Sequence, residues 1–270
     1  MPPDRRRDAL PDIPGLRDSI LPLCDGYYLE PSVKFRADAR ESARMVLGIH
    51  RDEARPGLRQ ALIGAARALG VPDTGQDEID LLFAEAHMLL LGQEGAGASA
   101  VRKIYLEFPQ APAHLPELRY IAWKVAPGRP VVRSLYRRVP VAAVLRNRQW
   151  PMAETTAPAL AAPLFEILRI AAKSCPPEEL TLMTVEEAGT LRASLNFSFY
   201  ESRLHLPDIA DPLARAVSAM GQDPALPEFS ATAAVGHLSW GLDRDGNPFL
   251  TIYADARRRE RRAPGDPELS

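Results

Sequence analysis

The chain has 270 residues, of which 46% are hydrophobic, and its 33 Lys and Arg nearly balance its 35 Asp and Glu. This composition predicts a chain that buries a substantial core, and the small net charge excludes a general electrostatic attraction to nucleic acid or to an anionic membrane. Cys24 and Cys175 are the only cysteines, which excludes a disulfide framework and favours a reducing compartment. Because no apolar run reaches about 18 residues, we expect no membrane span and a cytoplasmic location.

The first part of the chain is predicted to be a leader followed by helices. Residues 1–31 mix Pro, Arg and Asp with one short apolar stretch, and we expect a partly disordered leader there. A short strand is expected at 33–36. Residues 37–49, 57–69 and 78–91 carry apolar side chains at helical spacing, with Gly and Pro between them, and are predicted to be three helices.

From residue 101 onward, apolar and polar residues alternate in a way that predicts three β hairpins. The paired segments are 101–108 with 118–125, 180–185 with 192–200, and 235–242 with 249–254. The third hairpin is the clearest, because Asp245-Gly246 tolerates the positive φ of a tight reversal.

Two further helices are predicted in this part of the chain, at 159–173 and 207–220. Residues 131–148 fit either a helix or a strand, because Pro140 interrupts both. We therefore expect one α+β domain over residues 32–256, with helices on the apolar outer face of antiparallel hairpins. The charged segment 257–270 is expected to be a disordered tail.

The hairpin strands have one apolar and one polar face, because side chains on a strand alternate in direction. The polar face collects Lys103, Tyr105, Glu107, Tyr120, Lys124, Arg192, Ser194, Asn196, Ser198, Tyr200, His237, Ser239, Thr251 and Tyr253. An antiparallel sheet with this face exposed to solvent would be enough to explain the alternation of apolar and polar residues. However, tyrosines beside Lys and Arg can hydrogen-bond a phosphate and screen an electron-deficient carbon. This composition suits a diphosphate ester whose departure leaves a carbocation.

Three stretches resemble the ABBA-type aromatic prenyltransferases of bacteria: Arg102 to Pro109, with its basic–x–Tyr pattern, Leu180 to Glu201, and Leu238 to Tyr253. That family builds an antiparallel barrel from repeated α-α-β-β units, with helices outside and the active site inside. The resemblance implies an α+β fold with a closed or partly closed barrel. It also implies prenyl transfer from an isoprenoid diphosphate to an aromatic or other nucleophilic small-molecule acceptor, with no metal and no other cofactor. Since the family barrel has five units and only three hairpins are clear here, the chain resembles a shortened or divergent member.

The resemblance assigns roles to the polar face. Lys103, Lys124 and Arg192 would bind the diphosphate, while Tyr105, Tyr200 and Tyr253 would help to bind it and shield the cation.

The acceptor side has its own candidates on the same face. Glu107 and His237 are the catalytic candidates, which would orient or deprotonate the acceptor. Tyr120, Asn196 and Ser239 complete the predicted substrate-binding set. Lys103 and Glu107 could instead form a surface ion pair, and His237 could be a histidine beside a turn.

Other known site motifs are absent from the sequence. No Asp-Asp-x-x-Asp element could hold magnesium on a diphosphate, and the acidic residues 77–80 fit the first turn of a helix. Residues 92–97 lack the Lys-Ser/Thr of a nucleotide loop, and the histidines show no metal-ligand spacing. Two alternatives stay open: a non-catalytic accessory or partner-binding protein of the same architecture, and a small-molecule enzyme of other chemistry that uses the same basic, Tyr-rich cavity.

Overall fold

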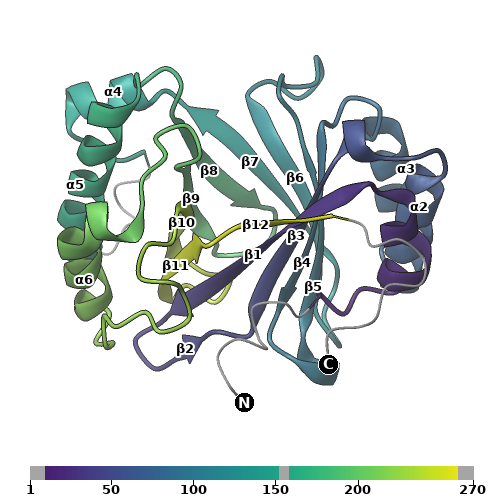
Figure 1. Cartoon of the computed structure of the whole chain (residues 1–270), viewed down its shortest axis with the longest axis horizontal. Coiled ribbons are helices and arrows are strands. Elements are labelled where there is room, and N and C mark those ends of the chain that lie inside the picture. The colour runs from purple at the N-terminus through teal and green to yellow at the C-terminus, as the bar shows by residue number, and fades with distance from the viewer. Residues whose placement is uncertain (1–9, 152–157, 261–270) are drawn as a thin grey trace.

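The computed structural model describes residues 10–151 and 158–260, which form an antiparallel β-barrel flanked by helices (Figure 1). The strands are β1 (Gly26–Phe35), β2 (Arg40–Glu41), β3 (Arg44–His50), β4 (Met88–Glu94), β5 (Val101–Glu107), β6 (Leu118–Val125), β7 (Val132–Val139), β8 (Thr181–Glu187), β9 (Ala193–Ser198), β10 (Val235–Leu242), β11 (Pro248–Ala254) and β12 (Arg257–Glu260). The helices are α2 (Leu58–Ala68), α3 (Asp73–Leu82), α4 (Val141–Asn147), α5 (Pro158–Ser174) and α6 (Ala210–Ala219). None of the helices in these ranges is long and apolar enough to cross a membrane.

The barrel closes where β1 meets β11. Neighbouring strands pair in the order β11-β10-β9-β8-β7-β6-β5-β4-β3-β1, and β1 then pairs with β11, so ten strands form a ring. Val33 lies opposite Ile252 in this closing pair. The first half of β1 pairs instead with β12, where Leu29 lies opposite Arg257. The predicted barrel is therefore fully closed, which removes the edges of the sheet.

The helices cover two opposite sides of the barrel (Figure 1). On one side α2 and α3 pack over an apolar cluster that includes Leu47, Leu91 and Trp123. On the other side α4, α5 and α6 pack over a cluster that includes Phe197 and Trp240. In both clusters the helices pack on side chains from the outer face of the strands, so the polar residues that alternate with those strand residues point into the barrel.

The interior side chains are sorted along the barrel axis. On β5, Lys103, Tyr105 and Glu107 point inward in succession, and each neighbouring strand presents inward residues at matching heights. One end, which we call the base, carries Lys103, Lys124 and Glu187. The other end, which we call the mouth, carries Glu107 and its neighbours. The sequence pattern thus places cations, then phenols, then carboxyl and imidazole groups along the same chamber.

The three predicted hairpins and the helix at 159–173 are confirmed by β5–β6, β8–β9, β10–β11 and α5. Within 207–220, a short helical turn at Leu206–Ile209 leads into α6. Residues 131–148, for which the sequence fits either a helix or a strand, contain one of each: β7 ends at Val139 and α4 begins after Pro140.

The N-terminal predictions need correction. Residues 37–49 are not a helix: they contain β2 and most of β3, in which Met45, Leu47 and Ile49 alternate with inward-facing residues. The predicted helix 78–91 is two elements, because α3 ends at Leu82 and β4 begins at Met88. Backbone pairing with β1 and β5 outweighs the helical spacing that Ala and Leu suggest in these segments.

The ends of the chain also differ from the predicted boundaries. β1 begins at Gly26, inside the expected leader, and its pairing with β3 on one side and β12 on the other makes it part of the barrel. Arg257–Glu260 forms β12 within the expected tail, whereas 261–270 and 1–9 lie outside the described residues.

The closing pair should be essential to stability. We expect Ile252→Ala to lower the free energy of unfolding by about 2–4 kcal/mol, because Ile252 is fully buried on the outer face of the closing strand. Leu81→Ala, at a residue 66% exposed, should change it by less than about 0.5 kcal/mol. Urea unfolding of both variants measures the difference, and equal losses would show that the seam is not part of the cooperative core.

Candidate functional site

A cavity of about 540 Å³ occupies the mouth half of the barrel. Its lining comes from nearly every strand of the ring and from the segments beyond β9 and β11. The residues are Tyr28, Glu30, Val46, Gly48, His50, His87, Met88, Leu90, Tyr105, Glu107, Arg119, Tyr120, Tyr136, Asn196, Tyr200, Glu201, Ala234, His237, Tyr253 and Ala256. The predicted polar face therefore lines an interior chamber.

The structure divides the predicted site residues between two regions. Seven of them line the cavity: Tyr105, Glu107, Tyr120, Asn196, Tyr200, His237 and Tyr253. The other four, Lys103, Lys124, Arg192 and Ser239, point inward at the base and do not line it. Ser239 is buried and donates a hydrogen bond to the carbonyl of Leu195 (3.1 Å).

Buried tyrosines separate the cavity from the base. Tyr105 and Tyr253 line both the large cavity and a void of about 10 Å³ among the base residues, so they stand between the two. The ring of Tyr136 lies 6.0 Å from that of Tyr105 and 5.7 Å from that of Tyr120. Burial raises the pKa of Tyr105 and of Tyr120 well above the ordinary value. The phenols therefore remain protonated and can donate hydrogen bonds.

Glu30 is a buried carboxyl group that sequence reasoning missed. It lies on the cavity wall in β1, is 7% exposed, and accepts a hydrogen bond from the Tyr200 hydroxyl (2.9 Å). Burial raises the pKa of Glu30 to about 7, and the hydrogen bond from Tyr200 partly opposes this. Gly236 makes room for the carboxylate, because a Cβ there would lie 1.7 Å from Glu30 Oε1. Glu30 is thus poised to exchange a proton near neutral pH.

The predicted catalytic residues, His237 and Glu107, both line the cavity but have different partners. The Nδ1 of His237 lies 3.2 Å from the Asn196 amide oxygen. Burial, with the nearby Arg119 charge, lowers the pKa of His237 to about 4, so its imidazole is neutral at physiological pH and a weak base. Glu107 accepts a hydrogen bond from the Arg119 guanidinium (2.5 Å) and is therefore held in an ion pair.

Arg119, His50 and His87 form one part of the cavity lining, which we call the basic wall. Arg119 NH1 donates to the carbonyl of Phe108 (2.7 Å), while its Nε is buried without a hydrogen-bond partner among the described residues. The rings of His50 and His87 lie 5.3 Å apart, and His87 Nδ1 is also buried without such a partner. This wall can donate hydrogen bonds to an anionic or carbonyl group that enters the mouth.

The base has two halves, each organised around one carboxylate. In the first half, Glu94 contacts the Lys103 ammonium and accepts a hydrogen bond from Arg44 NH2 (2.5 Å). Lys34 lies in the same half, with its ammonium 4.8 Å from the centre of the Phe249 ring. Arg44 is buried, and its NH1 has no hydrogen-bond partner among the described residues.

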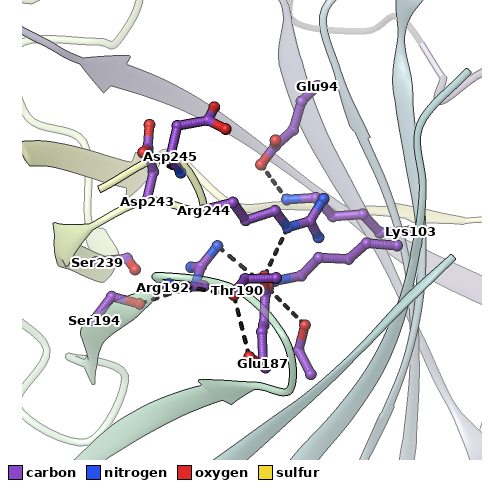
Figure 2. Close-up of polar contacts among 12 residues, drawn as sticks. Glu94, Lys103, Glu187, Thr190, Arg192, Ser194, Ser239, Asp243, Arg244 and Asp245 are labelled. Atoms are coloured by element: carbon purple, nitrogen blue, oxygen red, sulfur yellow. Dashed lines mark hydrogen bonds and ion pairs between the residues drawn. The ribbon is translucent and has the colours of Figure 1, made fainter. Parts of the chain in front are cut away.

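The second half centres on Glu187 (Figure 2). This carboxylate contacts the Lys124 ammonium and accepts hydrogen bonds from the Ser134 hydroxyl and from Arg244 Nε, both at 2.7 Å. Arg192 NH1 lies 3.5 Å from it. Burial acts to raise the pKa of Glu187, but the charges of Lys124 and Arg192 outweigh it and lower that pKa. Glu187 is therefore ionised.

The base carries more positive than negative charge. Its central cations, Lys34, Arg44, Lys103, Lys124 and Arg192, outnumber the central carboxylates, Glu94 and Glu187, by three when all are ionised. Arg44 also lies 3.6 Å from Glu41, and Glu187 is shared with Arg244. Two further arginines flank the base, Arg36 and Arg244, and so do two further carboxylates, Glu41 and Asp243. Including these four residues leaves the excess of positive charge unchanged.

The lysines at the base respond to this excess of positive charge. Burial lowers the pKa of Lys34 to about 8 and that of Lys103 to about 7, and neighbouring arginines lower both further although Glu94 opposes them. The base is thus a desolvated, under-neutralised site for an anion.

No family model and no curated protein match the sequence. The fold, however, matches solved structures over 84% of this chain. 5-Dimethylallyltryptophan synthase from Streptomyces coelicolor matches with a TM-score of 0.57 and 15% identity, over 80% of that chain. PriB in a binary complex with product diphosphate matches with a TM-score of 0.56 and 14% identity, over 79% of that chain. 6-Dimethylallyltryptophan synthase from Micromonospora olivasterospora, in complex with DMASPP and Trp, matches with a TM-score of 0.52 and 16% identity, over 81% of that chain. The predicted ABBA-type barrel is confirmed as the fold.

The raised pKa of Glu30 predicts a specific dependence of stability on pH. Because the folded state binds this proton more tightly than the unfolded state, Glu30 makes the protein less stable as pH rises from about 4.5 to about 7. Glu30→Gln removes this loss, so the variant should gain about 2–3 kcal/mol relative to the parent between pH 5 and pH 8. Urea unfolding at the two pH values measures the gain. A difference between variant and parent that is the same at both would show that Glu30 titrates normally.

Proposed function

We propose that the chain transfers a prenyl group from an isoprenoid diphosphate to an aromatic or similarly nucleophilic small-molecule acceptor. The observation that carries this proposal is the order of groups along one closed chamber. An excess of buried cations at the base is followed by neutral phenols and then by a cavity with a carboxyl group whose pKa is about 7. The cations would stabilise the leaving diphosphate, and the phenols would shield the carbocation. The carboxyl group would take the proton that the acceptor loses.

The donor diphosphate would bind at the base. A diphosphate ester carries about three negative charges near neutral pH, which matches the excess of three cations that the base has when Lys34, Lys103 and Lys124 are protonated. The bound diphosphate would itself favour that state, because a nearby anion raises the lowered pKa values of these lysines. Lys103 and Lys124 have long, flexible stems and would exchange carboxylate contacts for phosphoryl oxygens. Their charges, with those of Arg44 and Arg192, would stabilise the diphosphate as the bond between carbon and oxygen breaks, the task that a metal ion has in other enzymes.

The tyrosine layer would protect the allylic cation. Tyr105, Tyr136 and Tyr253 present rings and protonated hydroxyl groups between base and cavity. Aromatic faces attract a cation, and neutral phenols do not capture it as a carboxylate or a free amine would. The prenyl carbon would therefore emerge from this layer into the cavity.

The acceptor would occupy the cavity at the mouth. Its ring carbon forms the new bond to the prenyl carbon, and the proton lost from that ring carbon or from its heteroatom passes to Glu30. His237, Asn196 and Glu107 would position the acceptor, and Arg119 could meet an anionic group on it. The DMASPP and Trp complex of the Micromonospora protein supports an indole as the first acceptor to test.

Prenyl transfer should be measurable without added metal. Incubation with dimethylallyl diphosphate and tryptophan or a panel of simple indoles and phenols, in buffer containing EDTA, should give a prenylated product detectable by mass spectrometry. Arg192→Ala should lower kcat/KM at least about a hundredfold, because it removes a cation that would face the leaving diphosphate. Arg133→Ala is the control, since Arg133 pairs with Glu78 on the outer face. Absence of product across the panel, with no thermal protection by a thiolo-diphosphate analogue, would contradict the proposal and favour an accessory role.

The proton-accepting role of Glu30 makes a second, independent prediction. Since the Tyr200 hydrogen bond lowers the Glu30 pKa, Tyr200→Phe should raise that pKa and move the acidic limb of the kcat profile to higher pH. Rates measured from pH 5 to pH 9 with a saturating acceptor test this. Tyr28→Phe, which also lines the cavity, should leave the limb in place, and an unmoved limb in Tyr200→Phe would exclude Glu30 as the base.

A further inference from the structure

The base contains two carboxylates, although a site for a highly charged anion would be expected to contain only cations and neutral donors. Glu94 and Glu187 are the direct ion-pair partners of Lys103 and Lys124, and both lysines are buried. Burial would raise the pKa of Glu94, but Arg44, Lys103 and Lys34 outweigh it and lower that pKa. Both carboxylates are thus ionised, and each repels an entering anion at short range.

The half of the base around Glu94 offers an entering anion almost no free space. The void beside Arg44, Glu94 and Lys103 measures about 10 Å³, which is about the size of one water molecule. An anion can therefore enter only if the lysines turn from their carboxylates toward it. The oxygens of that anion must then replace the contacts that Glu94 and Glu187 now accept, or the buried donors are left unsatisfied.

The two halves of the base meet at one pair of neighbouring residues. Lys103 on β5 lies directly opposite Lys124 on β6 in the strand register, and both point inward. Glu94 serves the first of these lysines and Glu187 the second. A group with two linked phosphoryl units has enough oxygens and charge to replace both carboxylates at once, whereas a single phosphate or sulfate has fewer oxygens and less charge with which to replace them.

We propose that Glu94 and Glu187 determine the headgroup specificity of the base, as built-in competing anions that a diphosphate displaces and a monophosphate or sulfate does not. This inference rests on the proposed function, because it concerns the site that would hold the donor's leaving group. With both carboxylates ionised and the lysines protonated by the bound anion, about three negative charges neutralise the base, and a dianion leaves one cation uncompensated. Removing either carboxylate frees one lysine and strengthens the attraction for every anion, so the smaller anions gain entry.

The test compares anions of different size on single-charge variants. Thermal unfolding and calorimetric titration of the parent chain, with EDTA present, should show binding of inorganic diphosphate and little binding of orthophosphate or sulfate. Glu94→Gln and Glu187→Gln should each bind orthophosphate and sulfate about tenfold more tightly or better, which narrows the preference for diphosphate. Glu186→Gln is the matched control, because Glu186 pairs with Arg137 on the outer face and is exposed.

The outcomes separate this inference from the proposed function. If the parent binds no diphosphate, the proposed function is wrong. If the parent binds diphosphate and the two variants keep the parent's preference, or bind all three anions more weakly, the headgroup inference is wrong and the function stands. Glu187→Gln removes a carboxylate with four donor partners and can fail to fold alone. In that case, recovery of its folding by orthophosphate supports the inference, and titration of Glu94→Gln decides it.

Discussion

Closing the sheet between β1 and β11 encloses the inward-facing side chains of the ring in one chamber, most deeply at the base. Inside the closed ten-strand ring, each charged side chain must find a partner of opposite charge or shift toward its neutral form. The base shows both responses. Lys103 and Lys124 are paired with carboxylates, and the pKa of Lys103 nevertheless falls to about 7 because burial and neighbouring arginines outweigh its partner. The unsatisfied positive charge is therefore a direct consequence of closure.

The chamber is also ordered along its axis, and this order gives each chemical task its own environment. Charge pairing concentrates at the base, where the void among the cations is about 10 Å³, whereas the open volume of about 540 Å³ lies on the other side of the phenols. Water that enters the mouth meets Tyr105 and Tyr253 before it meets a lysine. A small void at the base strengthens the electrostatic interactions there, and in the proposed reaction it would limit the capture of a carbocation by water.

Much of this order could be predicted from the sequence, because alternating apolar and polar residues identify the two faces of a strand. The inward positions of Lys103, Tyr105, Glu107 and Tyr253 follow from it directly. Glu30 and Arg44 were missed although the same alternation is present, with Leu29, Val33, Met45 and Leu47 on the other face. Prolines and helical spacing obscured it in β1 and β3. Which lysine meets which glutamate could not be predicted at all, since Lys124 and Glu187 come together only when β6, β7 and β8 pair in register.

The strand that closes the barrel also links its two ends. β1 carries Glu30 at the mouth and Lys34 at the base, and its second half makes the closing pair with β11. Glu30 is buried against β10 at Gly236, and this burial raises its pKa although the hydrogen bond from Tyr200 opposes the shift, so the raised pKa depends on the ring being complete. If β1 shifted by one residue, Glu30 and Lys34 would both turn to the apolar outer face. The register of this one strand therefore fixes the positions of Glu30 at the mouth and of Lys34 at the base together.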